Sequence, residues 1–142
     1  MDHTPAVAAG DERALRLLDR MAVDEPHREA LKQLVLHAQN AAQNAGADLQ
    51  SEVGREHVGL IIGCNQFLRL WRDGPGAGHA EILLDVAARA ALPAAGFPLT
   101  PPDGAVFKMF GWVRFDPTEG DATALAPLVD KAFAKAQAAK KK

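Results

Sequence analysis

The residues best suited to chemistry in this chain are two tryptophans that each lie two positions from an arginine. They form the pairs Arg69/Trp71 and Trp112/Arg114. Because side chains in a β-strand alternate with a period of two, each pair would lie on one face of a strand. Guanidinium and indole groups side by side can bind planar or anionic groups through stacking, cation–π contact and charge-assisted hydrogen bonds. These residue types point to binding rather than to a reaction.

Alternation in neighbouring segments adds further side chains to this predicted face. Setting the strands in register gathers Phe67, Arg69, Trp71, His79, Glu81, Leu83, Asp85, Lys108, Phe110, Trp112 and Arg114. The predicted binding residues among them are Arg69, Trp71, His79, Lys108, Trp112 and Arg114. Two interpretations stay open, because such a face can pack within the protein or on a second subunit, or it can bind a ligand. Packing or dimerisation is favoured, since arginine stems often cover aromatic surface.

The five histidines do not form a recognisable metal-binding pattern. They are His3, His27, His37, His57 and His79. His27 and His37 are ten residues apart, which on one helix is roughly three turns and too far for one ion. Neither an H-E-x-x-H motif nor a second cysteine is present. We predict ordinary histidines, no metal and no cofactor.

Nucleophilic and phosphate-binding chemistry find little support either. Cys64 would need His57 or His79 as a base, and a lone cysteine after an apolar strand is more often a small buried residue. The glycine-rich run 74–78 leads into a strand and lacks the Gly-Lys-Ser/Thr ending of a phosphate loop. The sequence favours a protein that is not an enzyme.

The composition is that of an ordinary globular domain. The chain has 142 residues, of which 48% are hydrophobic and 24% charged, with a net charge of −2. We predict one domain over residues 1–142, with flexible ends at 1–10 and 138–142. The small negative charge argues against nucleic acid. The N-terminus does not resemble a signal peptide and no apolar run approaches ~20 residues, so we expect a cytoplasmic protein without a membrane segment.

Helices are predicted from apolar spacing and capping residues. They cover about 11–22, about 27–45, and a C-terminal segment from Asp121 or Thr123 to Ala139. The second begins with Asp24 as N-cap and Pro26 in its first turn, and Gly46 ends it. A short helix over about 86–92, capped by Asp85 and stopped near Pro93, is expected between two strands, followed by an irregular crossing.

Strands follow from alternating or short apolar runs. They are predicted at 58–62, 67–72, 79–86 and 106–116, the last as one strand or two. Short links between the first three predict an antiparallel meander. The fold class is therefore α+β: an antiparallel sheet of four to five strands, with an N-terminal helix pair and a C-terminal helix packed on one face. That face carries Leu68, Leu70, Ile82, Leu84, Val113 and Phe115.

A tryptophan-containing strand followed by an apolar helix is the most family-like part of the chain. Its residues are Gly111-Trp-Val-Arg-Phe115, an acidic spacer with glycine, and Leu125-x-x-Leu128-Val129-x-Lys131-Ala132-Phe133. Over about 106–136 the chain thereby resembles the small YjbR or MmcQ-like α+β proteins. The resemblance implies an α+β fold and DNA binding, and the acidic net charge argues against the latter.

The order of elements gives a second likeness. Helix, three strands, helix, one or two strands and helix is similar to the small acidic chaperones of secretion systems, which dimerise and bind an unfolded partner segment. The sequence thus predicts a small non-enzymatic binding module that associates with itself or another protein through the tryptophan and arginine face. Two alternatives remain. The first is binding of a small molecule, such as a small anion, or of nucleic acid by the same face, and the second is chaperone-like partner binding.

Overall fold

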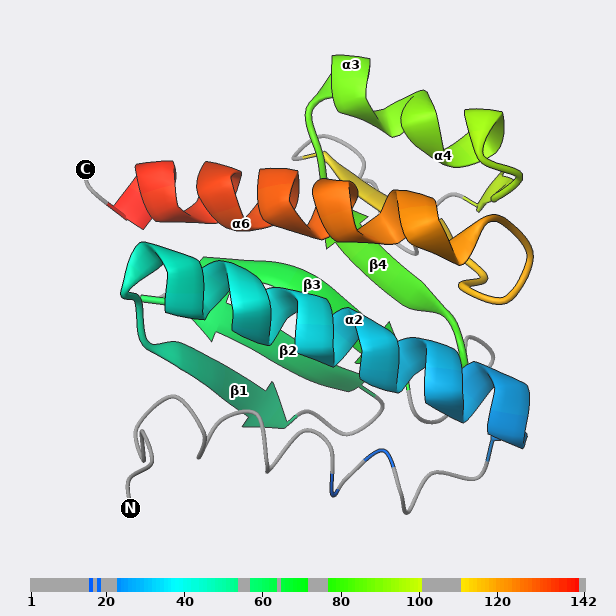
Figure 1. Cartoon of the computed structure of the whole chain (residues 1–142), viewed down its shortest axis with the longest axis horizontal. Coiled ribbons are helices and arrows are strands. Elements are labelled where there is room, and N and C mark those ends of the chain that lie inside the picture. The colour runs from blue at the N-terminus through cyan, green and yellow to red at the C-terminus, as the bar shows by residue number, and fades with distance from the viewer. Residues whose placement is uncertain are drawn as a thin grey trace.

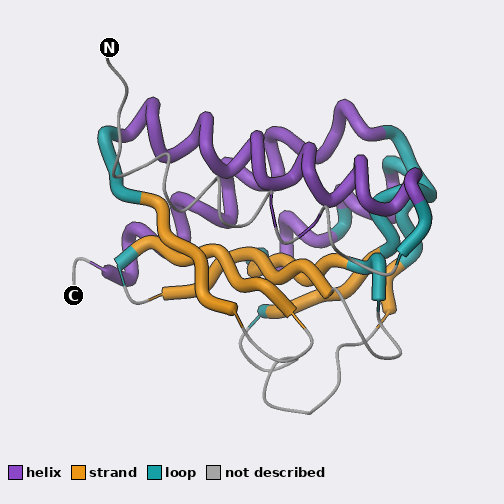
Figure 2. The backbone as a smooth tube through the Cα atoms, turned by 90° about the horizontal axis from the view of Figure 1, so that it is seen from below, coloured by secondary structure: helices purple, strands orange, loops and turns teal. Residues whose placement is uncertain are grey.

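The protein is an α+β structure in which helices cover one face of an antiparallel sheet (Figures 1 and 2). This computed structural model describes residues 16, 18, 23–53, 57–63, 65–71, 77–100 and 111–140. These residues form six strands: β1 Leu49–Val53, β2 His57–Ile62, β3 Asn65–Trp71, β4 Ala80–Leu83, β5 Leu99–Thr100 and β6 Trp112–Phe115. Their order across the sheet is β1-β2-β3-β4-β6-β5, and every pair is antiparallel. The predicted fold class is confirmed.

Two long helices, α2 (Glu25–Ala45) and α6 (Leu125–Lys140), lie side by side over the sheet (Figure 1). The ends of α2 match the sequence prediction. The side chain of Asp24 accepts a hydrogen bond from His27 N, Pro26 lies in the first turn, and Gly46 takes a left-handed φ of 64°. A residue with a side chain would be strained there, so glycine ends this helix cleanly.

The C-terminal helix begins through a short 3₁₀ turn, η1 (Ala122–Ala124). The Asp121 side chain accepts from Thr123 N at 3.0 Å, which satisfies one of the open donors of this turn. Pro127 is the third residue of α6, where its missing N–H has no intrahelical acceptor to lose. The apolar stripe predicted for this helix is buried: Leu125, Leu128, Val129, Ala132, Phe133 and Ala136.

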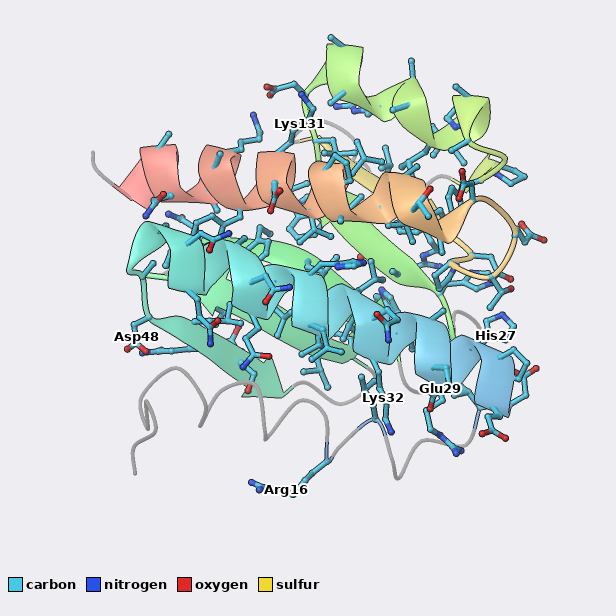
Figure 3. All side chains as sticks on the ribbon, in the orientation of Figure 1. Arg16, His27, Glu29, Lys32, Asp48 and Lys131 are labelled. Atoms are coloured by element: carbon cyan, nitrogen blue, oxygen red, sulfur yellow. The ribbon has the colours of Figure 1, made fainter. Side chains whose placement is uncertain are left out.

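The core lies between the helices and one face of the sheet. The face predicted to carry it is confirmed, because its residues belong to one buried cluster with the apolar stripes of α2 and α6. The sheet residues concerned are Leu68, Leu70, Ile82, Leu84, Val113 and Phe115. Charged side chains such as Glu29, Asp48 and Lys131 are exposed (Figure 3).

One residue was assigned to the wrong face. The register of β2 with β3 passes from Leu60↔Leu68 to Ile61↔Gln66, so Phe67 is the extra residue of a β-bulge. Its ring is fully buried and meets Phe133 of α6 edge-to-face at 5.6 Å. Strict alternation had put Phe67 on the opposite face, and the bulge breaks that alternation.

Some elements were missed or misplaced. The strands β1 and β5 were not predicted, and β5 lies within the expected irregular crossing. The expected helix over about 86–92 is two short helices, α3 (Val86–Arg89) and α4 (Ala91–Ala94), so Pro93 lies inside a helix rather than ending it. The Asp85 side chain makes no cap bond and binds Lys135 Nζ at 2.6 Å instead.

Parts of the prediction fall on residues that the structure does not describe. Of the first expected helix only Arg16 and Leu18 are described; both are helical, and Leu18 is fully buried. Cys64 and the segment 101–110 are outside the described residues. In the part of the chain that is described, no helix is long and apolar enough to cross a membrane.

Candidate functional site

One face of the sheet is turned away from α2 and α6, and the register of three strands aligns three charged residues on it. Arg69 of β3 pairs with Glu81 of β4, and Glu81 pairs with Arg114 of β6. Arg114 donates to Glu81 Oε2 through Nη2 at 2.8 Å and Nε at 3.1 Å. Arg69 Nη1 lies 3.7 Å from Glu81 Oε1, which is an electrostatic contact beyond hydrogen-bond length. Glu81 is therefore held between two cations.

The tryptophans complete this arrangement in a crossed pattern. The Arg69 guanidinium carbon lies 4.9 Å from the ring centroid of Trp112, and that of Arg114 lies 4.9 Å from Trp71. Each arginine thus stacks on the tryptophan that is distant in sequence, which sequence spacing alone did not indicate. We call these five residues, Arg69, Trp71, Glu81, Trp112 and Arg114, the Arg/Trp cluster.

Most of the Arg/Trp cluster is buried. Glu81 is 1% exposed, Arg114 6% and Trp112 7%. Burial lowers the pKa of Arg69, and the negative charges of Glu81 and Glu52 oppose that change. A buried ion pair needs good geometry and further hydrogen bonds to offset its desolvation, and here the aromatic faces supply part of the compensation.

The cluster leaves two buried polar atoms without a hydrogen bond among the described residues. They are the indole nitrogen Nε1 of Trp71 and the carboxylate oxygen Oε1 of Glu81. Trp71 as a whole is half-buried, and its ring centroid lies 5.2 Å from that of His57. Buried donors without acceptors are rare and costly, so the Trp71 N–H is an unusual feature of the cluster.

Gln66 supports the cluster from the side of the bulge. Its Oε1 accepts from Arg69 Nε at 2.7 Å and its Nε2 donates to Glu52 Oε1 at 2.6 Å. Gly59 makes room for it, because a Cβ at that position would lie 2.6 Å from Gln66 Nε2. The bulge at Phe67 brings Gln66 to the same face as Arg69, although the two are three residues apart.

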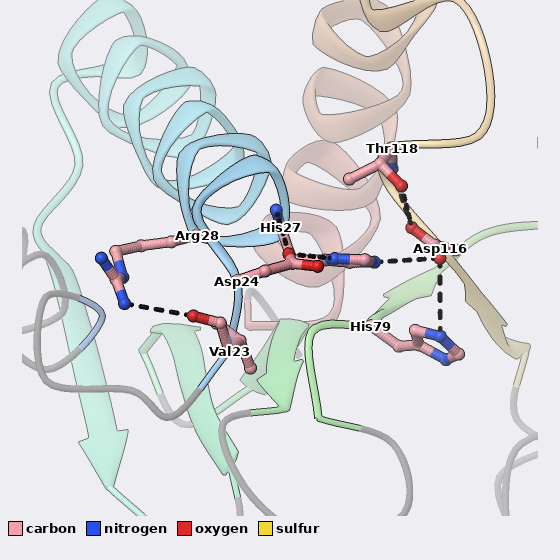
Figure 4. Close-up of polar contacts among 7 residues, drawn as sticks. All are labelled: Val23, Asp24, His27, Arg28, His79, Asp116 and Thr118. Carbon is pink, nitrogen blue, oxygen red and sulfur yellow. Dashed lines mark hydrogen bonds and ion pairs between the residues drawn. The ribbon is translucent and has the colours of Figure 1, made fainter.

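A second set of polar residues lies at the end of the sheet, around the Asp116 carboxylate (Figure 4). Its Oδ2 lies 3.0 Å from His27 Nε2 and 3.7 Å from His79 Nε2. Its Oδ1 accepts from the backbone N of Thr118 at 2.9 Å and from the Thr118 hydroxyl at 2.7 Å. On the other side of His27, Nδ1 lies 2.6 Å from Asp24 Oδ1. We call these five residues the Asp116 cluster.

The contacts in the Asp116 cluster favour charged side chains. The hydrogen bond to Asp116 raises the pKa of His27; burial opposes this, and the bond to Asp24 adds to it. Burial alone would raise the pKa of Asp116, but hydrogen bonds from Thr118 and His27 outweigh it and hold that pKa below its usual range. The bond from His27 likewise lowers the pKa of Asp24.

The predicted site residues thus fall into three groups. Arg69, Trp71, Trp112 and Arg114 come together, as the sequence suggested. His79 belongs to the neighbouring Asp116 cluster, and Lys108 lies outside the described residues.

Two features of these sites were missed. Glu81 was placed on this face but not recognised as the centre of the cluster. The pairing of His27 with Asp116 spans 89 positions and carries no local sequence signal. Among the described ranges, no group of three or more His, Cys, Asp or Glu residues is placed to hold a metal ion.

Comparisons with protein-family models, with curated proteins and with solved structures gave no match to this chain. The resemblance to YjbR or MmcQ-like proteins and the likeness to secretion chaperones therefore stay predictions.

Proposed function

We propose that the protein is a non-enzymatic binding module that associates with a second copy of itself through the Trp71 side of the Arg/Trp cluster. The observation that carries this proposal is the half-buried Trp71, a large aromatic side chain that stays partly exposed at the border of the cluster. The ring is held by the Arg114 guanidinium and the His57 ring, so little side-chain entropy is left to lose on binding. Rigid tryptophans of this kind are common anchors of protein interfaces.

Charge on this face supports a protein partner over an anion. The register places Glu52, Arg69, Glu81 and Arg114 in one row across the sheet, with Gly59 between the first two. Two carboxylates and two guanidinium groups give a row without excess charge, which does not attract nucleic acid or a phosphate strongly. A second copy presents the same compensated, aromatic surface, as a two-fold symmetric interface requires.

The crossed stacks favour one alternative function. Guanidinium groups held on indole faces are also the means by which proteins bind planar anions. A small anionic ligand would have to displace part of the Arg114–Glu81 pair, which is buried and hydrogen-bonded at 2.8 Å. That cost makes self-association the better supported function.

Sedimentation velocity over a wide range of protein concentration tests the proposal. We expect the mass to rise toward a dimer, and Trp71→Ala to weaken association by about 2 kcal/mol or more, roughly 30-fold in Kd, if the ring is a central anchor. Trp71→Phe keeps an aromatic side chain but removes the N–H and part of the indole, so we expect a smaller loss than for Trp71→Ala. Leu99→Ala is the matched control, since Leu99 is an exposed apolar residue (39%) at the far edge of the sheet.

The alternatives give different results. Salt-sensitive quenching of tryptophan fluorescence by nucleotides, acyl-CoA species or single-stranded DNA, with a constant monomer mass, would replace self-association by anion binding. If the protein stays monomeric at every concentration and binds none of these ligands, both functions are contradicted. An effect of Trp71→Ala on thermal stability alone would assign the ring to packing.

A further inference from the structure

Both ring nitrogens of His27 face carboxylate oxygens. Nδ1 lies 2.6 Å from Asp24 Oδ1, and Nε2 lies 3.0 Å from Asp116 Oδ2. An ionised carboxylate only accepts hydrogen bonds, and a neutral imidazole carries a single N–H. Both contacts can be hydrogen bonds at the same time only if His27 is doubly protonated. The geometry alone therefore specifies the imidazolium form.

We infer that His27 is a protonation-controlled clamp between the start of α2 and the end of β6. As an imidazolium it donates to Asp24 and Asp116 together, and after losing one proton it can hold only one of them. The other carboxylate then faces a ring nitrogen that has a lone pair instead of a proton, so the contact turns from attractive to repulsive. The link between helix and sheet at this end weakens.

The surroundings of His27 fix the ring in this bridging position. Gly78, before β4, packs beneath it, and a Cβ there would lie 3.0 Å from His27 Cδ2. His79 is the other titratable group nearby, with its ring centroid 6.5 Å away and its Nε2 3.7 Å from the same Asp116 oxygen. The neighbouring cation on α2, Arg28, donates to the Val23 carbonyl on the side away from Asp116 (Figure 4).

The direction in which pH changes the stability follows from the shifted pKa values of His27, Asp24 and Asp116. The pKa of His27 is raised, so its contribution to stability is complete below its unfolded value of about 6.5 and is lost as pH rises through the folded value. The pKa values of Asp24 and Asp116 are lowered, so their contributions are complete above about 3.9 and are lost as pH falls through the folded values. The clamp is strongest in the mildly acidic range between these limits.

Backbone hydrogen bonds connect the surroundings of the clamp to the Arg/Trp cluster. The backbone of Trp71 pairs with the segment that carries His79, through Trp71 N to His79 O at 2.9 Å and Gly78 N to Trp71 O at 2.8 Å. A change at Asp116 is therefore two contacts away from the backbone of Trp71. The clamp itself is independent of the proposed self-association, and it can be tested on the monomer.

Nitrogen-detected NMR of the histidine rings gives the first test. At about pH 6 we expect both His27 nitrogens to carry protons, with a titration midpoint above that of an exposed histidine. Asp116→Asn should move that midpoint downward, because an amide does not stabilise the imidazolium charge. His27→Gln assigns the signal. A single N–H at this pH, or a midpoint that Asp116→Asn leaves in place, would refute the clamp.

Thermal stability at about pH 5.5 and about pH 8.5 gives the second test. In the unchanged protein the clamp should raise the Tm, and this stabilisation should decrease as the pH rises. His27→Gln and Asp116→Asn should each abolish this pH-dependent stabilisation. His37→Gln is the matched control on the same helix: burial lowers the pKa of His37, so its contribution rises with pH instead. If all three variants change the pH dependence in the same direction, the clamp does not exist.

Discussion

The Arg/Trp cluster and the Asp116 cluster follow the same plan with different chemistry. In each, one carboxylate approaches nitrogen atoms from two separate segments: Arg69 and Arg114 at Glu81, His27 and His79 at Asp116. The Glu81 side chain is 1% exposed and that of Asp116 is 17% exposed. The cations at Glu81 are guanidinium groups, which stay charged, whereas imidazole changes its charge near neutral pH.

This difference separates a fixed element from an adjustable one. The buried cluster is held by permanent charge, aromatic stacking and short hydrogen bonds, so it can only be intact or broken. The partly exposed cluster is screened by water and depends on a proton, so its strength can vary without unfolding the chain. The first suits a rigid base for a binding surface, and the second suits the control of a junction between elements.

The largest expected effect is at the centre of the buried cluster. Glu81→Ala leaves the buried Arg114 and the partly buried Arg69 without this counter-charge, and we expect a loss of about 3–5 kcal/mol in the free energy of unfolding. Urea denaturation followed by circular dichroism measures it. Glu52→Ala removes an exposed carboxylate from the same row and should change stability by no more than about 0.5 kcal/mol. Equal effects of the two variants would show that burial does not distinguish them.

A smaller effect should separate the two arginines of this cluster. Arg114→Lys loses the paired hydrogen bonds to Glu81 and the stack on Trp71, at a cost of about 1–3 kcal/mol. Arg69→Lys should cost less, because the 3.7 Å contact of Arg69 with Glu81 is too long for a hydrogen bond and the Arg69 side chain is more exposed than that of Arg114. Denaturation curves give both values, and tryptophan emission reports the lost stacks. A larger loss for Arg69→Lys would reverse this ranking.

Local sequence patterns were enough to predict most of the fold. The N-cap at Asp24, the glycine end at Gly46 and the buried stripe of α6 depend on neighbours within a few residues, and all three are confirmed. Phe67 was misassigned because a β-bulge is set by pairing with another strand, not by the residue itself. The strand β5 was missed because two residues give no period to detect.

The sites were predictable only where one strand holds the relevant residues. The pairs Arg69/Trp71 and Trp112/Arg114 are visible as two-residue spacings. Their crossed stacking depends on the alignment of β3, β4 and β6, which no single segment encodes. His27 and Asp116 meet because the end of β6 lies beside the start of α2, and this proximity is a property of the whole fold (Figure 4).

A third prediction uses two equivalent turns to isolate the Asp116 cluster. Thr118 donates to Asp116 through its hydroxyl at 2.7 Å, as Thr123 does to Asp121 at 2.7 Å. Thr118→Val should cost about 0.5–1.5 kcal/mol, the usual net value of a hydrogen bond, and Thr123→Val should cost less because Asp121 is fully exposed. Only Thr118→Val should also change the NMR titration of His27. A change of that titration in both variants would mean that it reports general stability.

The smallest expected effect concerns Gly59 and the support of Arg69 by Gln66. In Gly59→Ala the new methyl group would lie 2.6 Å from Gln66 Nε2, so this flexible side chain must move away from Glu52 and Arg69. The loss of about 1 kcal/mol in hydrogen bonds should nearly cancel the gain of about 0.5–1 kcal/mol from replacing a glycine within a strand.

A double-mutant cycle separates these two contributions. In a Gln66→Ala background the crowded side chain is gone, so Gly59→Ala should stabilise the protein by the backbone gain alone, and urea denaturation of the four proteins measures the difference. If Gly59→Ala destabilises both backgrounds equally, Gly59 is required by the backbone of β2 and not by the side chain that holds Arg69 in the buried cluster.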